Sequence, residues 1–134
     1  MIIVVDANPF IAGFLRNSFS RKILLSEKIV LHAPAWMKEE FERNEPSLKR
    51  KFPSGADFSK TKEILFEFVN LVPASEYSSF VREATGLAKH SKDIPYFALA
   101  LYLKCPLWSE EKSFKKQSTV KVYSTSDLFR ELAL

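Results

Sequence analysis

Ile2-Ile3-Val4-Val5-Asp6-Ala7-Asn8-Pro9 is the stretch of sequence around which the rest of the chain is organised. Its first four residues are apolar, too short a run for a helix and too apolar for a half-exposed strand. They predict a strand buried on both faces, as in a parallel sheet covered by helices. Asn8 and Pro9 then predict the N-cap and first turn of a helix. Asp6 therefore lies where open α/β sheets bind ligands, although it could equally only stabilise the turn through nearby backbone N–H groups.

The composition is that of one domain covering residues 1–134. With 134 residues, of which 46% are hydrophobic, the chain can bury a single sizeable core. The net charge of +4 permits a polyanionic partner without requiring one. A single cysteine, Cys105, excludes an internal disulfide, and no apolar run is long enough to cross a bilayer. We therefore expect a cytoplasmic protein without membrane contact.

Apolar runs and amphipathic segments alternate along the chain. Strands are predicted at 2–5, 29–32, 71–72, 105–108 and 120–123, and helices at 10–15, 20–27, 35–44, 47–52, 57–69, 76–89, 93–103 and 128–134. The segment 94–103 is apolar on nearly all sides, which predicts a buried central helix. The connections are long enough for parallel pairing. Together these patterns predict a three-layer α/β/α sandwich around a central parallel sheet.

Three acids stand at the ends of strands or helices where they can share a site. Asp6 follows the first strand, and Glu111 lies just past the strand that contains Trp108. If both strands are central and parallel, their carboxylates face the same crevice. Asp93 begins the most buried helix, where an N-cap role is the simpler explanation. Capping would leave its second oxygen free to face a cation.

Glu40 is a fourth candidate because of its helical angle. At about 100° per residue, the buried arc of this helix is defined by Ala33, Trp36, Met37 and Phe41. Glu40 falls inside that arc, between Trp36 and Met37, whereas Glu39 and Glu42 fall outside it. A glutamate that points at the core must be paired, neutralised or bound to a cation. A basic partner from elsewhere in the chain, or a simple solvated run of charge, would also explain this position.

Carboxylates without accompanying thiols or imidazoles suit a hard cation, and Mg²⁺ or Mn²⁺ fits better than Zn²⁺. Such an ion keeps positions open for water and phosphate oxygens, so the chemistry indicated is hydrolytic phosphoryl transfer. Several basic side chains could guide an RNA backbone, although solvated surface charge is the commoner role of any one of them. They are Lys49, Arg50, Lys51, Lys112, Lys115 and Lys116.

With these segments in place, the chain resembles the PIN domain family over essentially its whole length. The resemblance rests on four segments in order, 4–8, 33–41, 93–100 and 107–112. It implies a parallel α/β/α fold and a metal-dependent ribonuclease. The implied ligands of Mg²⁺ or Mn²⁺ are Asp6, Glu40, Asp93 and Glu111, with Asn8 and Ser109 in support. Many such proteins resemble the toxins of toxin–antitoxin pairs, which implies a small antitoxin-like protein partner and a homodimer.

The chain departs from the family pattern at Glu111, where the family usually has Asp. The extra methylene moves the carboxylate by about an ångström, a displacement that matters for catalysis. Two functions therefore stand open: a metal-dependent endoribonuclease, or a non-catalytic PIN-like module that binds RNA or protein with a degraded metal site. Receiver domains and haloacid-dehalogenase-type phosphatases share the architecture, but the former need a second strand-end Asp and the latter an Asp in place of Asn8.

Overall fold

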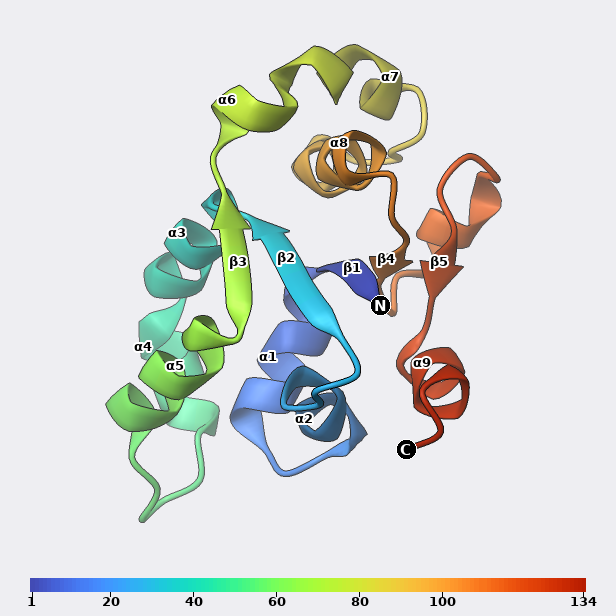
Figure 1. The fold of residues 1–134 in the computed structure, drawn as a ribbon. Helices are drawn as coiled ribbons and strands as arrows, with labels where there is room; N and C mark the ends of the chain where they lie inside the picture. The colour runs from blue at the N-terminus through green and yellow to red at the C-terminus, as the bar shows by residue number, and fades with distance from the viewer.

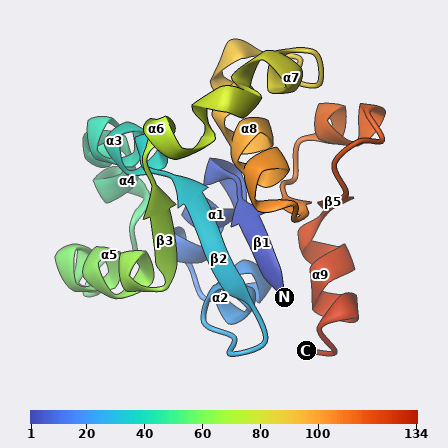
Figure 2. The same cartoon turned by 45° about the horizontal axis from the view of Figure 1, so that its top comes forward.

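Five short strands form one parallel sheet in the order β3-β2-β1-β4-β5. The computed structural model describes all residues, 1–134 (Figure 1). The strands are β1 Ile2–Val5, β2 Val30–Pro34, β3 Val69–Val72, β4 Leu107–Trp108 and β5 Val122–Tyr123. β1 is central and its last three residues are fully buried, which confirms the strand predicted at the N-terminus. Figure 2 shows β1, β2 and β3 side by side and pointing the same way.

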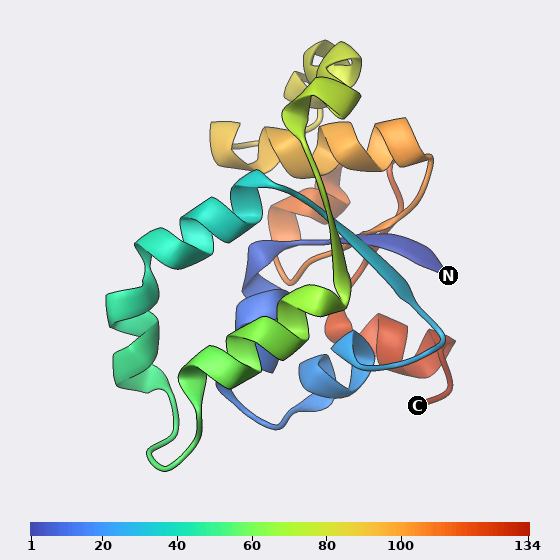
Figure 3. The same ribbon diagram turned by 60° about the vertical axis from the view of Figure 1, so that its left-hand side comes forward.

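Helices cover both faces of this sheet. The α-helices are α1 Ala7–Leu15, α2 Phe19–Leu24, α3 Trp36–Arg43, α4 Glu45–Lys51, α5 Phe58–Glu67, α6 Ala74–Tyr77, α7 Val81–Thr85, α8 Ile94–Leu103 and α9 Thr125–Glu131. Three short 3-10 helices complete the chain, η1 Ser78–Phe80, η2 Ser91–Asp93 and η3 Lys112–Lys116. Figure 3 shows α8 along one face, with α6 and α7 outside it, and α1, α2 and α5 along the other. The predicted three-layer α/β/α architecture is confirmed.

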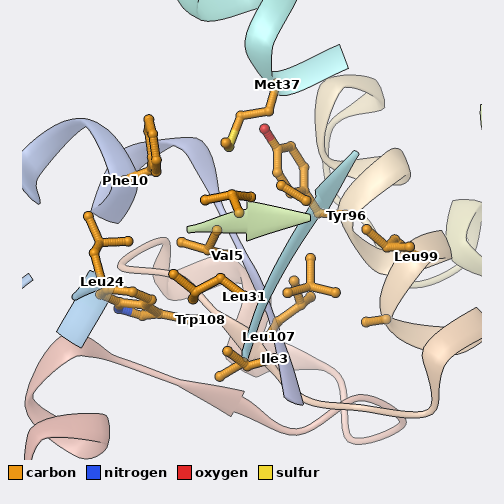
Figure 4. Close-up of a cluster of buried hydrophobic side chains, with 14 of the residues drawn as sticks. Ile3, Val5, Phe10, Leu24, Leu31, Met37, Tyr96, Leu99, Leu107 and Trp108 are labelled. Carbon is orange, nitrogen blue, oxygen red and sulfur yellow. The ribbon is translucent and has the colours of Figure 1, made fainter. Parts of the chain in front are cut away.

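The core fills the space between the sheet and both helical layers. Figure 4 shows side chains of β1, β2 and β4 between Phe10 and Leu24 on one side and Tyr96 and Leu99 of α8 on the other. α8 buries five consecutive residues, Tyr96–Ala100, as its all-round apolar pattern predicted. No helix combines the length and apolar character that a membrane-spanning segment requires.

A cluster of aromatic rings fixes α3 against α1. The ring centroids of Phe14 and Phe41 lie 4.9 Å apart, and those of Phe10 and Phe41 lie 6.0 Å apart, both in edge-to-face geometry. Such pairs contribute about 0.5–1.5 kcal/mol each beyond the burial of their area. Because α1 follows Asp6 directly and α3 carries Glu40, this packing sets the distance between two of the candidate acids.

Some predicted boundaries are wrong. The first helix begins at Ala7 and not after Asn8, because Asp6 takes the N-cap position and accepts a hydrogen bond from the Ala7 amide. The helix predicted at 57–69 ends at Glu67 because Val69 pairs with Leu31 in the sheet. The single helix predicted at 76–89 is divided into α6, η1 and α7. The helix predicted at 20–27 ends earlier, at Leu24.

Lys28 joins the two ends of the chain. Its backbone carbonyl accepts a hydrogen bond from the Met1 amino group at 2.9 Å, and its Nζ donates to the carbonyl of Leu132 at 2.7 Å. This contact lies where β1 and β2 begin. The candidate acids lie at the opposite, carboxyl ends of the strands.

The contact between α1 and α2 generates a prediction about stability. A Cβ added at Gly13 would overlap the buried side chain of Leu24 and lie 3.1 Å from the backbone nitrogen of Arg21. We expect Gly13→Ala to lower the free energy of unfolding by about 1–3 kcal/mol, measured by urea denaturation. Gly86→Ala is the matched control, because its Cβ would meet its nearest neighbour at an ordinary 3.4 Å. Unchanged stability of Gly13→Ala would contradict this packing.

Candidate metal centre

Asp6 stands where β1 ends and α1 begins. Its Oδ1 accepts a hydrogen bond from the Ala7 amide, and its Oδ2 accepts one from the Ser109 hydroxyl, both at 2.8 Å. Its own amide donates to the carbonyl of Trp108 at 2.9 Å, so the pairing of β1 with β4 positions the residue. Only 6% of Asp6 is exposed. Burial raises the pKa of Asp6 to about 6, and the charges of Asp93 and Glu111 act in the same direction.

The two glutamates after β4 have different surroundings. The Glu110 carboxylate accepts a hydrogen bond from the Thr125 amide at 2.6 Å, at the start of α9. Glu111 lines the same pocket as Asp6, and its amide donates to the Ser109 hydroxyl at 3.0 Å. Ser109 therefore contacts both Asp6 and Glu111. Of the two glutamates, the geometry favours Glu111 as the site residue.

Glu40 occupies the half-buried side of α3. Glu39 and Glu42 are exposed, as the helical angle predicted. Glu42 forms an ion pair with Lys62 at 2.9 Å, outside the pocket. No hydrogen bond or ion pair engages the Glu40 carboxylate, so the basic partner that could have explained its position is absent. Glu40 lines the pocket that also contains Asp6.

Asp93 occupies the N-cap position of α8, but its side chain does not cap the helix. The residue is only 6% exposed, and its Oδ2 is buried without a hydrogen-bond partner. Burial raises its pKa, the charges of Lys92 and His90 lower it, and that of Glu111 raises it. Capping therefore does not account for this carboxylate.

One pocket brings the candidate acids together at the carboxyl ends of the central strands. Its lining residues are Asp6, Ala7, Asn8, Trp36, Glu40, Lys92, Asp93, Tyr96 and Glu111. Asn8 is exposed at this pocket and its side chain makes no hydrogen bond. Trp36, Lys92 and Tyr96 were not predicted. The spacing of Tyr96, one helical turn after Asp93, is the signal that could have found it.

The predicted basic residues lie outside the pocket. Lys115 forms an ion pair with Asp127 at 2.7 Å, and Lys49 lies 4.0 Å from Glu45. The remaining four are exposed and form no ion pair: Arg50, Lys51, Lys112 and Lys116. Lys112 directly follows Glu111, which makes it the nearest of the set to the pocket in sequence. Lys92 is the one cation that lines the pocket.

The donor set of the pocket suits a hard divalent cation. As the side chains stand, no group of three or more acids, histidines or cysteines forms a ready-made metal cluster. The pocket nevertheless offers carboxylate oxygens, one of which, Asp93 Oδ2, is buried and unpaired. The charge of Glu111 raises the pKa of both Asp6 and Asp93, and that of Asp93 raises the pKa of Asp6, a repulsion that a cation would relieve. These residues therefore fit a hard divalent cation that prefers oxygen ligands.

A parallel α/β/α sandwich with acids gathered at the carboxyl ends of its central strands is the class of protein that the fold and pocket define. The PIN domain family matches residues 4–132, and the chain belongs to this family. PIN domains are generally nucleases that depend on divalent metal ions.

Comparison with solved structures supports the same fold. A chain in the crystal structure of VapBC2 from Rickettsia felis, bound to a DNA fragment from their promoter, is similar with a TM-score of 0.65 and 12% sequence identity. The similarity covers 92% of this chain and 98% of that one. No curated protein matches the sequence significantly.

The raised pKa of Asp6 predicts how stability depends on pH. Asp6 ionises near pH 3.8 in the unfolded chain but only at about 6 in the folded protein, so its ionised form destabilises the fold above that pH. Without metal, we expect the stability of Asp6→Asn relative to the wild type to increase by on the order of 2 kcal/mol as the pH rises from the ordinary pKa to above 6. A loss that does not depend on pH is superimposed, because the amide oxygen of Asn can accept from only one of the two donors, the Ala7 amide and the Ser109 hydroxyl.

Denaturant titrations across this pH range measure the effect. Asp127→Asn is a control of opposite sign, because hydrogen bonds from Lys115 and the Ser124 amide lower the pKa of Asp127. That variant should be less stable than the wild type at neutral pH. A pH-independent difference between Asp6→Asn and the wild type would contradict the environment described for Asp6.

Proposed function

We propose that this chain is an endoribonuclease that requires Mg²⁺ or Mn²⁺ and hydrolyses RNA phosphodiester bonds. The observation that carries the proposal is the convergence in one pocket of Asp6, Glu40, Asp93 and Glu111, which come from four separate segments of a PIN domain. Acids so far apart in sequence have no evident structural reason to share a pocket. Two of them, Asp6 and Asp93, are also buried at a cost that folding alone does not explain.

In this proposal the four acids would hold the cation, and the chemistry that it would supply is the activation of water and the neutralisation of charge on the phosphodiester. Ser109 keeps Asp6 in one orientation, because its hydroxyl donates to one oxygen while the Ala7 amide donates to the other. Asn8 serves as a supporting polar group beside Asp6. Lys92 at the pocket and the exposed Lys112 next to it in sequence attract the RNA backbone.

The other predicted basic residues have smaller parts in this proposal. Lys116, Arg50 and Lys51 are exposed without an ion pair and remain candidates for contacts with a longer RNA. Lys115 forms an ion pair with Asp127, so it is less available to contact RNA. The general attraction of these cations for phosphate is independent of base sequence.

A second candidate function is a non-catalytic PIN-like module that binds RNA or protein. The observation that favours it is Glu111, whose side chain is exposed although Asp6 and Asp93 are buried. Its oxygen Oε1 is 3.5 Å from the Ser113 hydroxyl, at the edge of hydrogen-bond distance. An exposed carboxylate with so weak a contact is a poorer metal ligand than a buried and oriented one, which favours the binding module. The two functions separate on whether metal-dependent cleavage occurs.

We also propose a small antitoxin-like protein as partner, a toxin role in the cytoplasm, and a homodimer. The fold similarity to a chain of the VapBC2 complex supports the antitoxin-like partner. The homodimer is a family expectation. Large apolar side chains on the surface, such as Phe19 at 60% and Ile2 at 51% exposure, are compatible with contact to another chain.

Cleavage of RNA is the direct test of the enzyme. Purified protein incubated with single-stranded RNA and Mn²⁺ should cut the RNA, and a chelator should stop the reaction. Asp6→Asn should lower the rate by roughly 100-fold, because it removes a negatively charged ligand whose orientation is already fixed. Asp57→Asn is the matched control, since Asp57 is exposed and only caps α5. Cleavage that persists undiminished in Asp6→Asn would eliminate the mechanism.

The glutamate at position 111 has its own test. We expect Glu111→Asp to raise the cleavage rate, because the shorter side chain restores the residue usual at this position in the family. Glu110→Asp is the control at the neighbouring position, which contacts α9 instead of the pocket. If neither the wild type nor Glu111→Asp cleaves RNA, the binding module is the better description.

A further inference from the structure

Tyr96 is buried in the pocket with an unpaired hydroxyl. Three buried polar side-chain atoms in the structure have no hydrogen-bond partner, and two of them, Asp93 Oδ2 and the Tyr96 hydroxyl, belong to pocket residues. Tyr96 is only 2% exposed. A buried hydroxyl without a partner destabilises a fold, and phenylalanine would fill the same space without that cost. The hydroxyl therefore has no role in stability that the structure reveals.

The surroundings of this hydroxyl are acidic. Burial raises the pKa of Tyr96 far above its ordinary value, and the charges of Asp6, Glu40 and Asp93 add to the effect. Those acids come from the end of β1, from α3 and from the start of α8. The hydroxyl is thus a neutral donor surrounded by potential acceptors. Figure 4 shows it turned toward Met37 of α3, one helical turn before Glu40.

Glu40 is the acid best able to accept from this donor. The hydrogen bonds from Ala7 and Ser109 fix the orientation of Asp6, and in that orientation neither oxygen bonds to the Tyr96 hydroxyl. Asp93 is 6% exposed, so its buried side chain has little freedom to move toward the Tyr96 hydroxyl. As the structure stands, Asp93 Oδ2 does not accept a hydrogen bond from that hydroxyl. The Glu40 side chain is longer, half-buried and without a partner, so it can rotate toward the pocket interior.

We propose that Tyr96 is a positioning residue, whose hydroxyl donates a hydrogen bond to the Glu40 carboxylate when Glu40 turns inward to join the other acids around a divalent cation. This role rests on the metal binding of the proposed function. Without the cation, the Glu40 carboxylate has no partner and the hydroxyl remains unpaired. With the cation bound, the hydrogen bond would select one orientation of the Glu40 carboxylate.

Thermal unfolding of the metal-free protein gives a readout that does not depend on any ion. Tyr96→Phe should have an equal or higher Tm than the wild type, because it removes an unpaired buried hydroxyl. Tyr102→Phe is the matched control on the same helix, 39% exposed and outside the pocket. A lower Tm for Tyr96→Phe alone would show that the hydroxyl already has a structural partner, and would overturn the proposal.

Binding of Mn²⁺, measured by titration calorimetry, tests the positioning itself. Tyr96→Phe should weaken binding by about tenfold, and Tyr102→Phe should leave it unchanged. The loss should disappear when Tyr96→Phe is combined with Glu40→Ala, but persist when it is combined with Glu111→Gln. An equal loss in both backgrounds would overturn the coupling to Glu40.

The outcomes also separate this proposal from the proposed function. If the wild type binds Mn²⁺ and Tyr96→Phe binds it equally well, the positioning role fails and the metal-dependent function stands. If the wild type itself binds no Mn²⁺, the metal-dependent function fails, and the positioning role fails with it.

Discussion

The hydrogen bond from the Ser109 hydroxyl to Asp6 is the contact on which the arrangement of the pocket depends. It joins residues 103 positions apart, and it can form only because β1 and β4 pair in parallel, with Val5 opposite Trp108. The chain adds β2 and β3 on one side of β1 and then β4 and β5 on the other side. Parallel sheets leave a crevice beyond the carboxyl ends of the strands at such a switch point, which here lies between β1 and β4. The same hydroxyl accepts from the Glu111 amide, so one side chain relates the acid of β1 to the acid that follows β4. The chemistry of the pocket thus follows from the topology of the sheet.

The pocket costs stability that the core must offset. Burial raises the pKa of both Asp6 and Asp93, and the charge of Glu111 adds to the effect on each. The hydroxyl of Tyr96 and one oxygen of Asp93 lack partners. Against this, α1 and α3 are held by edge-to-face phenylalanine pairs, and α8 is buried along half its length. Packing of the helices holds the acids at one pocket in spite of this repulsion, although their side chains do not form a metal cluster as they stand. A fold selected only for stability would replace these groups with apolar ones.

Many features of the fold and pocket could be predicted from the sequence wherever a pattern of apolar residues is compatible with only one local structure. The buried β1, the central α8 and the inward angle of Glu40 all followed from apolar periodicity. The helix predicted at 76–89 failed because Tyr77 and Ala84 are buried while Val81 between them is 38% exposed, so the face is not continuous. Tyr96 was missed because its ring belongs to the core and only its hydroxyl faces the acids. Glu110 is directed away from the pocket by its hydrogen bond with the Thr125 amide at the start of α9. The sequence around Glu110 and Glu111 gives no sign of this contact with a distant residue.

Lys28 contacts residues at both ends of the chain, Met1 and Leu132. The amino group of Met1 and the carbonyl of Leu132 both bond to Lys28, at the side of the sheet where β1 and β2 begin. A linker between the two ends would lie on this side of the sheet, and new ends could be opened in the exposed loop around Gly55. Such a circular permutant would keep every strand pairing that brings Asp6 next to Ser109, and attachments at the original ends would leave the acidic pocket open.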